Sequence, residues 1–365
     1  MEVLTRAPSY PYGKVYAGYK NKVYQQTDFK GVKIHRFPII PGYQKSSFIK
    51  VLNYLNFVFF SLIILLAIGR RFDRIFIYQT GPLTQAIAGV VAKKIYKSKL
   101  IIWTQDLWPD SVFAYGFRKT KLLKYFLNKL VRFVYKNCDE IIVSCEGFIQ
   151  KLNEFVPGKQ INYIPNWPII NDFTIKNVGL NKGFNFTFTG NVGKMQNLEN
   201  VIQGFNLFQK NKPEVYLNIV GDGSNLIHLK ELVAQNGISN VVFTGRKPVE
   251  DMPSYYNESD VLLLSLIDEP IYEITIPSKF QTYLTASKPI FAIMKGELRN
   301  LVIKHQIGEV ADPSDIDGIA EGFERLFFKD KEMLIKMSLN SQALLKSDFS
   351  KVENMDKISR FIAIQ

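Results

Sequence analysis

The stretch DVLLLSLIDEPIYEITIPSKFQTYLTASKP, residues 260–289, reads as a strand, a loop and a helix in succession. The apolar run Val261–Leu266 predicts a buried strand, and Pro277-Ser278-Lys279 predicts a helix start, because a first helical turn tolerates proline. The free N–H groups of that turn, beside a lysine, favour an anionic, phosphate-like group. Glu273 and Gln281 flank this point, and both can bind sugar hydroxyls. A capped helix after a solvated acidic loop explains the segment equally well.

Length and composition limit the classes of protein to which the chain can belong. The chain has 365 residues, of which 47% are hydrophobic and 22% charged, enough for two globular domains. Two cysteines, Cys138 and Cys145, are too few for a disulfide framework and suit a reducing compartment. We expect no metal site, because no histidine has metal-ligand spacing to another or to a cysteine; the three are His35, His228 and His305.

The net charge of +13 is concentrated in the first half. Residues 1–166 contain 25 Lys and Arg against 9 Asp and Glu, whereas residues 167–365 contain 21 against 24. This asymmetry indicates an anionic partner for the first half: nucleic acid, a membrane surface or an acidic substrate. Nucleic acid is disfavoured, because there is no zinc-finger spacing, RNP-like motif or basic zipper. The expected helix Lys121–Lys136 is basic on one side and apolar on the other, as at a membrane surface or on the solvated face of a packed helix.

The longest apolar run is Phe57–Gly69, FVFFSLIILLAIG, and basic residues follow it. Thirteen helical residues reach roughly 20 Å, short of the ~30 Å hydrocarbon core of a bilayer. We therefore favour a helix buried in the protein over one partly sunk into a membrane face.

Alternating strands and helices predict two Rossmann-like α/β domains with parallel sheets. The prolines of Pro165-Asn166-Trp167-Pro168 indicate the boundary, so we expect an N-terminal domain over 1–166 and a C-terminal domain over 167–345. Residues 346–365 are expected to form a helix that packs back on the first domain. Ligands of such sheets bind outside the carboxyl ends of the strands.

Four turns of the second half occupy that position. Gly190–Lys194 follows a strand and precedes a helix, where glycine lets backbone N–H groups approach a phosphate. Gly221-Asp222-Gly223 and Gly245-Arg246 follow the next two strands, and the segment that holds Lys279 follows the fourth. Each turn alone is a weak signal, but four in register indicate a nucleotide site.

Together these motifs resemble retaining glycosyltransferase family 4, which has the GT-B architecture of two Rossmann-like domains facing a cleft. The resemblance extends to a subgroup of bacterial N-acetyl-fucosamine-type transferases of O-antigen and capsule biosynthesis. QDLWP and PSKxQxY are its most specific motifs. The matching stretches are APSYPYGKVYAGYK (7–20), FIYQTGP (76–82), WTQDLWPDS (103–111), IPNW (164–167), FTGNVGKMQNLENVI (188–202), VGDG (220–223), FTGRKPVEDMPSYYNESDVLLLSL (243–266) and PSKFQTYLTASKPI (277–290).

The resemblance implies roles for individual residues of the second domain. The diphosphate would be held by Gly193, Lys194 and Lys279, the nucleobase would face Gly245 and Arg246, Glu273 would contact the donor sugar, and Gln281 would contact the ribose. Gly190, Gly221 and Ser278 complete the expected donor site. The family pairs two glutamates where this chain has Glu273 and Gln281, and glutamine can hydrogen-bond a ribose without carrying charge. Family members also open with a βα unit before the strand at Glu2–Thr5, so we expect that unit to be missing from the first domain.

The implied activity is transfer of a sugar, an N-acetylated or deoxy hexose, from a UDP-sugar to a polyprenyl-diphosphate-linked saccharide. It would need no metal ion, and the catalytic candidates are Asp106, Glu273 and Lys279. Asp106 would orient or deprotonate the acceptor hydroxyl, although a turn carboxylate is as common in such a loop. Trp108 would stack on a sugar, unless it serves packing. Tyr10, Tyr12 and Lys14 would line the acceptor entry.

A lipid-linked acceptor and the basic first half imply a cytoplasmic protein, peripheral on the inner leaflet of the cell membrane and held by anionic lipids. Two alternatives remain. A GT-B epimerase or phosphorylase would share the diphosphate turns, although the charge asymmetry argues against it. A non-catalytic, truncated GT-B remnant would bind nucleotide or a partner glycosyltransferase.

Overall fold

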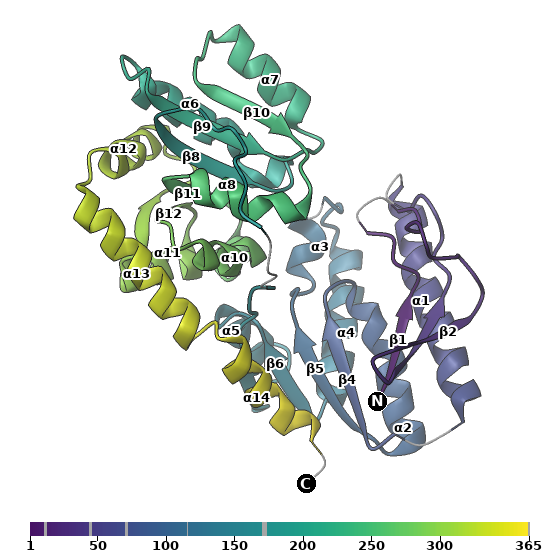
Figure 1. Cartoon of the computed structure of the whole chain (residues 1–365). Helices are drawn as coiled ribbons and strands as arrows, with labels where there is room; N and C mark the ends of the chain where they lie inside the picture. The colour runs from purple at the N-terminus through teal and green to yellow at the C-terminus, as the bar shows by residue number, and fades with distance from the viewer. Residues whose placement is uncertain (11–12, 44–45, 70–71, 115, 170–173, 364–365) are drawn as a thin grey trace. The chain divides into compact units, whose positions relative to one another are not determined.

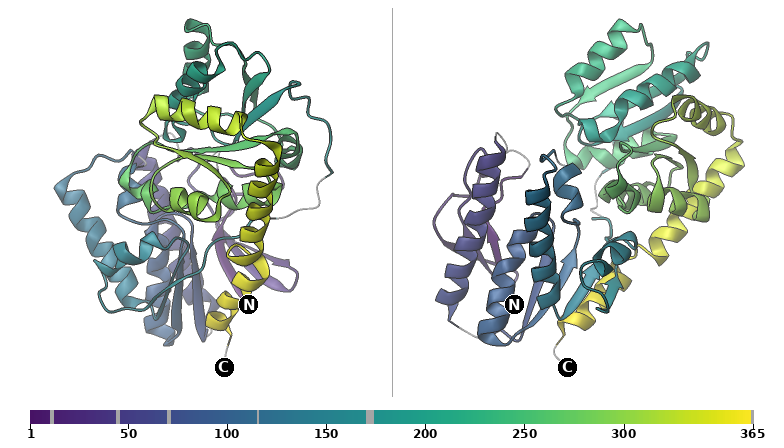
Figure 2. Two further views of the ribbon diagram at one scale, coloured as in Figure 1. Left: turned by 90° about the vertical axis from the view of Figure 1, so that its left-hand side faces the viewer. Right: turned by 180° about the vertical axis from the view of Figure 1, so that it is seen from behind.

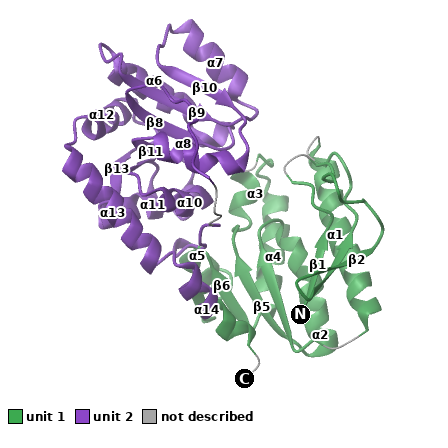
Figure 3. Ribbon diagram, in the orientation of Figure 1, with its two compact units in different colours: residues 1–144, 148–163, 358–365 green, residues 145–147, 164–357 purple. Residues whose placement is uncertain are grey.

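The computed structural model describes residues 1–10, 13–43, 46–69, 72–114, 116–169 and 174–363. It divides the chain into two compact units (Figure 3). Unit 1 comprises residues 1–144, 148–163 and 358–365, and unit 2 comprises residues 145–147 and 164–357. The last residues thus belong to unit 1, where Arg74 donates a hydrogen bond to the Phe361 carbonyl (2.6 Å).

Unit 1 contains two sheets rather than the single parallel sheet expected. In the first, β3 (Val32–Phe37) pairs with β1 (Glu2–Arg6) in parallel and with β2 (Gln25–Phe29) in antiparallel fashion. A two-residue turn, Lys30-Gly31, joins β2 to β3, and both residues have positive φ, as such hairpin turns require. The second sheet is parallel and runs β4 (Arg74–Gln79), β5 (Lys99–Thr104), β6 (Glu140–Val143), β7 (Ile161–Tyr163).

Three long helices lie side by side over these strands: α1 (Ser47–Ile68), α2 (Ala86–Tyr96) and α4 (Lys121–Asn137) (Figure 2). Shorter elements are η1 (Leu83–Gln85), α3 (Asp110–Ala114) and α5 (Gly147–Asn153). The expectation that the apolar run is buried is wrong, because α1 is longer than that run and buries only Asn53, Ser61 and Ile64. Its first turn is capped by Ser46, whose hydroxyl accepts from the Phe48 N–H at 3.2 Å.

Unit 2 is built on a six-stranded parallel sheet in the order β10-β9-β8-β11-β12-β13 (Figure 1). Chain order reverses between β8 and β11, so the crevice expected of an open α/β sheet lies at their carboxyl ends. The strands are β8 (Phe184–Thr189), β9 (Val215–Val220), β10 (Val241–Gly245), β11 (Val261–Ser265), β12 (Ile290–Ile293) and β13 (Gly308–Ala311).

Aromatic side chains fill the core of unit 2. Phe323 contacts Phe186, Phe205 and Phe291, with ring centroids 4.8–5.4 Å apart. Three helices close the chain, and the side chains of Asp315 and Asp330 cap the first two of them. The remaining elements are η2 (Lys194–Gln196), α6 (Leu198–Gln209), α7 (Leu226–Gln235), η3 (Val249–Asp251), α8 (Met252–Glu258), α9 (Pro270–Glu273), α10 (Ser278–Ala286), α11 (Gly296–His305), α12 (Ile316–Phe327), α13 (Lys331–Ser347) and α14 (Lys351–Ile362).

Candidate functional site

At the switch point of unit 2, the turns after β8 and β9 pack backbone against backbone. The Gly190 N–H donates to the Val220 carbonyl (2.8 Å), and the Val192 N–H donates to the Asp222 carbonyl (2.9 Å). A Cβ on Gly221 would lie 1.8 Å from the Gly190 oxygen. Only glycine fits so close an approach, so both turns hold one fixed conformation.

Lys279 reaches this turn from α10. Its Nζ lies 3.9 Å from the centroid of the Phe188 ring, and a Cβ on Gly190 would lie 2.6 Å from the same atom. Within the part of the chain that the structure describes, its ammonium has no carboxylate partner. Desolvation lowers the pKa of Lys279 to about 7. An anion bound here would stabilise the charged form and raise that pKa again.

The position of α10 is set by Tyr283, a residue that sequence reasoning did not single out. Strands β8 and β11 pair only at Phe186↔Val261 and Thr187↔Leu262, so they part before their carboxyl ends. The fully buried Tyr283 hydroxyl accepts from the Thr189 N–H at 3.1 Å and also contacts the Thr189 hydroxyl at 3.1 Å. Tyr283 follows Lys279 by four residues on the same helix, and this spacing was the signal available in the sequence.

The helix itself begins one residue later than expected. Pro277 is the N-cap, Ser278 is the first helical residue and is exposed, and no side chain caps the first turn. Gln281 is 2% exposed, and its amide, oriented as a donor, lies 2.8 Å from the Ser278 carbonyl and 3.2 Å from the Pro277 carbonyl. The expected ribose ligand therefore faces its own helix in this structure, whereas Glu273, at the end of α9, is exposed.

The loop that carries Glu273 is anchored by residues that sequence reasoning missed. A Cβ on Gly296 would lie 1.9 Å from the Glu273 carbonyl oxygen, so α11 starts directly against this loop. The Ile276 N–H donates to the Cys145 sulfur at 3.2 Å. Glu297, beside Gly296, accepts from the N–H groups of Glu146 (2.9 Å) and Gly147 (3.0 Å). These contacts hold the segment between α9 and α10 in place. They could not be predicted from the sequence, because their partners are far apart along the chain.

The other expected donor-site residues lie at the same edge of the sheet. The Gly193 N–H donates a hydrogen bond to the side-chain oxygen of Gln196 at 2.9 Å. Lys194, in η2, is exposed. Gly245 has φ +69° at a register shift that ends β10, and Arg246 after it is exposed. Glycine relieves the strain of that turn, and the arginine is open to solvent.

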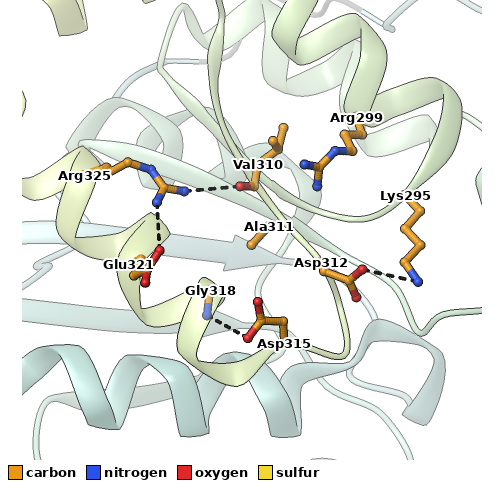
Figure 4. Close-up of a pocket in the computed structure, with 9 residues that line it drawn as sticks. All are labelled: Lys295, Arg299, Val310, Ala311, Asp312, Asp315, Gly318, Glu321 and Arg325. Carbon is orange, nitrogen blue, oxygen red and sulfur yellow. Dashed lines mark hydrogen bonds and ion pairs between the residues drawn. The ribbon is translucent and has the colours of Figure 1, made fainter.

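A separate hollow of about 340 Å³ lies beyond β12 and β13, and charged side chains line it (Figure 4). Lys295 contacts Asp268 (2.5 Å) and Asp312 (3.3 Å), and Arg325 contacts Glu321 (3.5 Å). The lining also includes Arg299, so its three cations face three carboxylates, those of Asp312, Asp315 and Glu321. This balance of charge makes the hollow a poorer anion site than the turn at Lys279.

In unit 1, Asp106 follows β5. Desolvation raises its pKa to about 6, although the nearby polar side chains of Ser111 and Trp108 partly oppose the shift. Trp108 is 6% exposed and packs near Tyr54, with ring centroids 6.4 Å apart, so its ring faces protein rather than solvent. A carboxylate with such a pKa can exchange a proton near neutral pH.

Two of the three acceptor-side candidates after β1 lie within the described residues. Tyr10 is 76% exposed and Lys14 is also exposed, whereas Tyr12 lies outside the described residues. Over those same described residues, no group of three or more His, Cys, Asp or Glu side chains could hold a metal ion.

Comparison with known proteins identifies the second unit. Residues 171–343 match the family described as Glycosyl transferases group 1. Unit 2 thus matches a group 1 glycosyltransferase domain. The chain is accordingly a glycosyltransferase, as its turns and motifs predicted.

Two curated glycosyltransferases are similar to this one at low identity. The probable glycosyltransferase WbjE of Pseudomonas aeruginosa is 24% identical over 274 residues, covering 72% of this chain and 67% of WbjE. The putative colanic acid biosynthesis glycosyl transferase WcaI of Escherichia coli K12 is 21% identical over 368 residues, covering 95% and 89%. The subgroup implied by the motifs stays a prediction.

Solved structures confirm the GT-B fold of this glycosyltransferase. Anabaena HepE in complex with UDP superposes with a TM-score of 0.68 at 15% identity, over 90% of this chain and 85% of HepE. The UDP-forming α,α-trehalose-phosphate synthase of Burkholderia xenovorans gives a TM-score of 0.74 at 9% identity, over 99% of both chains. At these identities the likeness establishes the fold and no more.

Proposed function

We propose that this glycosyltransferase moves a sugar from a UDP-sugar to a polyprenyl-diphosphate-linked saccharide in surface polysaccharide synthesis, with retention at the anomeric carbon. The observation that carries the proposal is the Lys279 ammonium, which lies against Gly190 with no carboxylate partner among the described residues. The complexes of HepE with UDP and the colanic acid role named for WcaI support the donor and the pathway class.

In the proposed reaction, the bond between the anomeric carbon and the β-phosphate oxygen breaks and UDP leaves. The acceptor oxygen bonds to the same face of that carbon and gives up its proton, for which Asp106 is our candidate base. Lys279 and the uncapped start of α10 offset the charge that develops on the diphosphate. We propose that they take the place of a divalent ion, so EDTA should leave turnover unchanged.

We further propose that the enzyme works in the cytoplasm, peripheral on the inner leaflet of the cell membrane, where a polyprenyl-linked acceptor is presented. The excess of Lys and Arg in residues 1–166 supports an anionic membrane partner.

The test is turnover with a panel of UDP- and GDP-sugars and short polyprenyl-diphosphate saccharides, followed by UDP release and by NMR of the new linkage. Product with the donor's anomeric configuration supports the proposal. An inverted product contradicts retention, and UDP binding without turnover on any acceptor favours the non-catalytic remnant.

UDP affinity is expected to fall by up to tenfold for each pH unit above 7. Free Lys279 has a pKa of about 7, and the diphosphate favours its charged form, so the pKa in the complex is higher and binding above pH 7 takes up a proton. Below pH 7 the lysine is already charged and this dependence disappears. Calorimetry in buffers of different ionisation enthalpy measures the uptake, which Lys279→Gln should abolish. Equal proton uptake by the variant would exclude Lys279 as its source.

Asp106→Asn is expected to lower kcat by about 10²-fold, as loss of a general base does. Because ionised Asp106 is the active form, wild-type kcat/KM should fall about tenfold for each pH unit below its pKa of about 6, and the variant should lose this dependence. Asp110→Asn is the matched control, since Asp110 begins α3 and lies 4.0 Å from Lys151. An unchanged acidic limb in Asp106→Asn would contradict the assignment.

A further inference from the structure

Helix α1 exposes an apolar stripe along its whole length. The helix has 22 residues, few of which are buried, and by length and composition it is long and apolar enough to cross a membrane. On its inner side, Phe57 and Phe60 contact Phe37 of β3. The exposed large apolar residues follow the helical repeat on the opposite side, away from the sheet; they are Phe48, Val51, Leu52, Leu55, Phe59, Ile63 and Leu66.

The neighbouring helices continue this surface. Helix α2 lies beside α1, and α4 lies beside α2 (Figure 2). Helix α2 adds the half-exposed Ile95 and the exposed Lys94. The outward side of α4 mixes apolar residues, Leu122, Tyr125, Phe126 and Phe133, with exposed cations, Lys121, Lys124, Lys129, Arg132 and Lys136. We call the outward sides of α1, α2 and α4 the three-helix face.

The charge of this face has one sign. The three helices have 22, 11 and 17 residues and contain eight Lys and Arg but no Asp or Glu. Water-facing surfaces normally intersperse both signs. Two copies of the chain meeting through this face would bring like charges together, which disfavours self-association. Apolar and aromatic side chains among cations are instead the composition of an element that lies on an anionic bilayer.

We propose that the three-helix face docks on an anionic lipid bilayer. The α1 stripe enters the boundary between headgroups and acyl chains, and the α4 lysines and arginine contact lipid phosphates. Helix α1 lies along the membrane rather than across it, because its inner side is packed on β3 through Phe57 and Phe60. The three-helix face is then the surface through which the enzyme takes up the peripheral membrane location proposed above. Docking does not depend on the donor chemistry, which belongs to unit 2.

The test is cosedimentation of the full chain with sucrose-loaded vesicles of phosphatidylcholine, with and without phosphatidylglycerol. Two double variants probe the face: Lys124→Glu with Lys129→Glu, and Leu55→Glu with Phe59→Glu. Ile227→Glu is the matched control, because Ile227 is 74% exposed on α7 of unit 2. Circular dichroism of every variant, together with its UDP-dependent shift in Tm, reports folding.

The wild type and the control should bind only the anionic vesicles at low salt. The lysine variant should lose at least about 25-fold in partitioning, since each of the two lost basic residues contributes on the order of fivefold and the new glutamates add repulsion. The stripe variant should bind weakly at every salt concentration. Wild-type binding to neither vesicle, or equal binding by folded variants, would overturn the proposal. So would a wild-type dimer that the stripe variant dissociates without change in vesicle binding, because a second copy would then cover the face. Turnover with a soluble acceptor is read separately, so failure to dock does not count against the glycosyltransferase reaction.

Discussion

Lys279→Ala is expected to lower kcat/KM by about 10²- to 10³-fold and to remove the rise in Tm that we expect UDP to cause. The ammonium lies against Gly190 and has no carboxylate partner in the described residues, and desolvation makes each of its electrostatic interactions stronger than in water. Steady-state kinetics and a thermal titration with UDP measure the two effects, because a ligand that binds only the folded state raises Tm by mass action.

Lys288→Ala is the matched control. Lys288 lies just beyond the other end of α10 and donates to the Asn257 carbonyl at 2.9 Å. Its loss should leave the UDP shift intact. If both variants kept the full shift and normal turnover, the diphosphate would have to bind elsewhere on unit 2.

Gly221→Ala is expected to destabilise unit 2 by about 4 kcal/mol, which for a unit of this size lowers Tm by roughly 10 °C. The added Cβ would lie 1.8 Å from the Gly190 oxygen, and both partners are backbone, so neither side can move without opening the turn after β8. The UDP-dependent shift should fall as well, since the same movement displaces Gly190 from Lys279. Differential scanning calorimetry with and without UDP measures both.

Gly237→Ala is the control that separates the cost of backbone strain from the cost of a steric clash. Gly237 also has positive φ, +58°, but a Cβ there would meet nothing within 4 Å. We expect it to cost about 1 kcal/mol. Equal losses of stability in the two alanine variants would mean that the contact between the two turns contributes little.

The sequence was sufficient to predict the strand–turn–helix order of unit 2. Strands such as Val261–Ser265 are fully buried, and a short apolar run between turn residues is the plain signal for such a strand. Lys279 could be placed near a phosphate-binding turn because it opens the helix after that strand. The early end of the pairing between β8 and β11 could not be predicted, since the Thr189 N–H donates there to a side chain, that of Tyr283, from a different helix.

Sequence patterns predicted less of the structure of unit 1. Strand β2, with the sequence QQTDF, has no apolar alternation, so only its turn and its partner strand make it a strand. Hydropathy identified the helix in α1 but could not say what covers it, and two of its three buried residues, Asn53 and Ser61, are polar. The pKa of Asp106 is likewise raised by burial, which depends on tertiary packing that the local sequence does not show.

The hydrogen bond from Thr189 to Tyr283 also bears on kinetics. A side chain of α10 holds the end of β8, and backbone hydrogen bonds join the turn after β8 to the turn after β9. Few residues of the site therefore have to become ordered when a nucleotide binds. Binding to a preformed surface loses less conformational entropy than binding to a loop that must fold around its ligand. Association should therefore follow a single phase that rises linearly with nucleotide concentration, without the plateau that a slow rearrangement would impose.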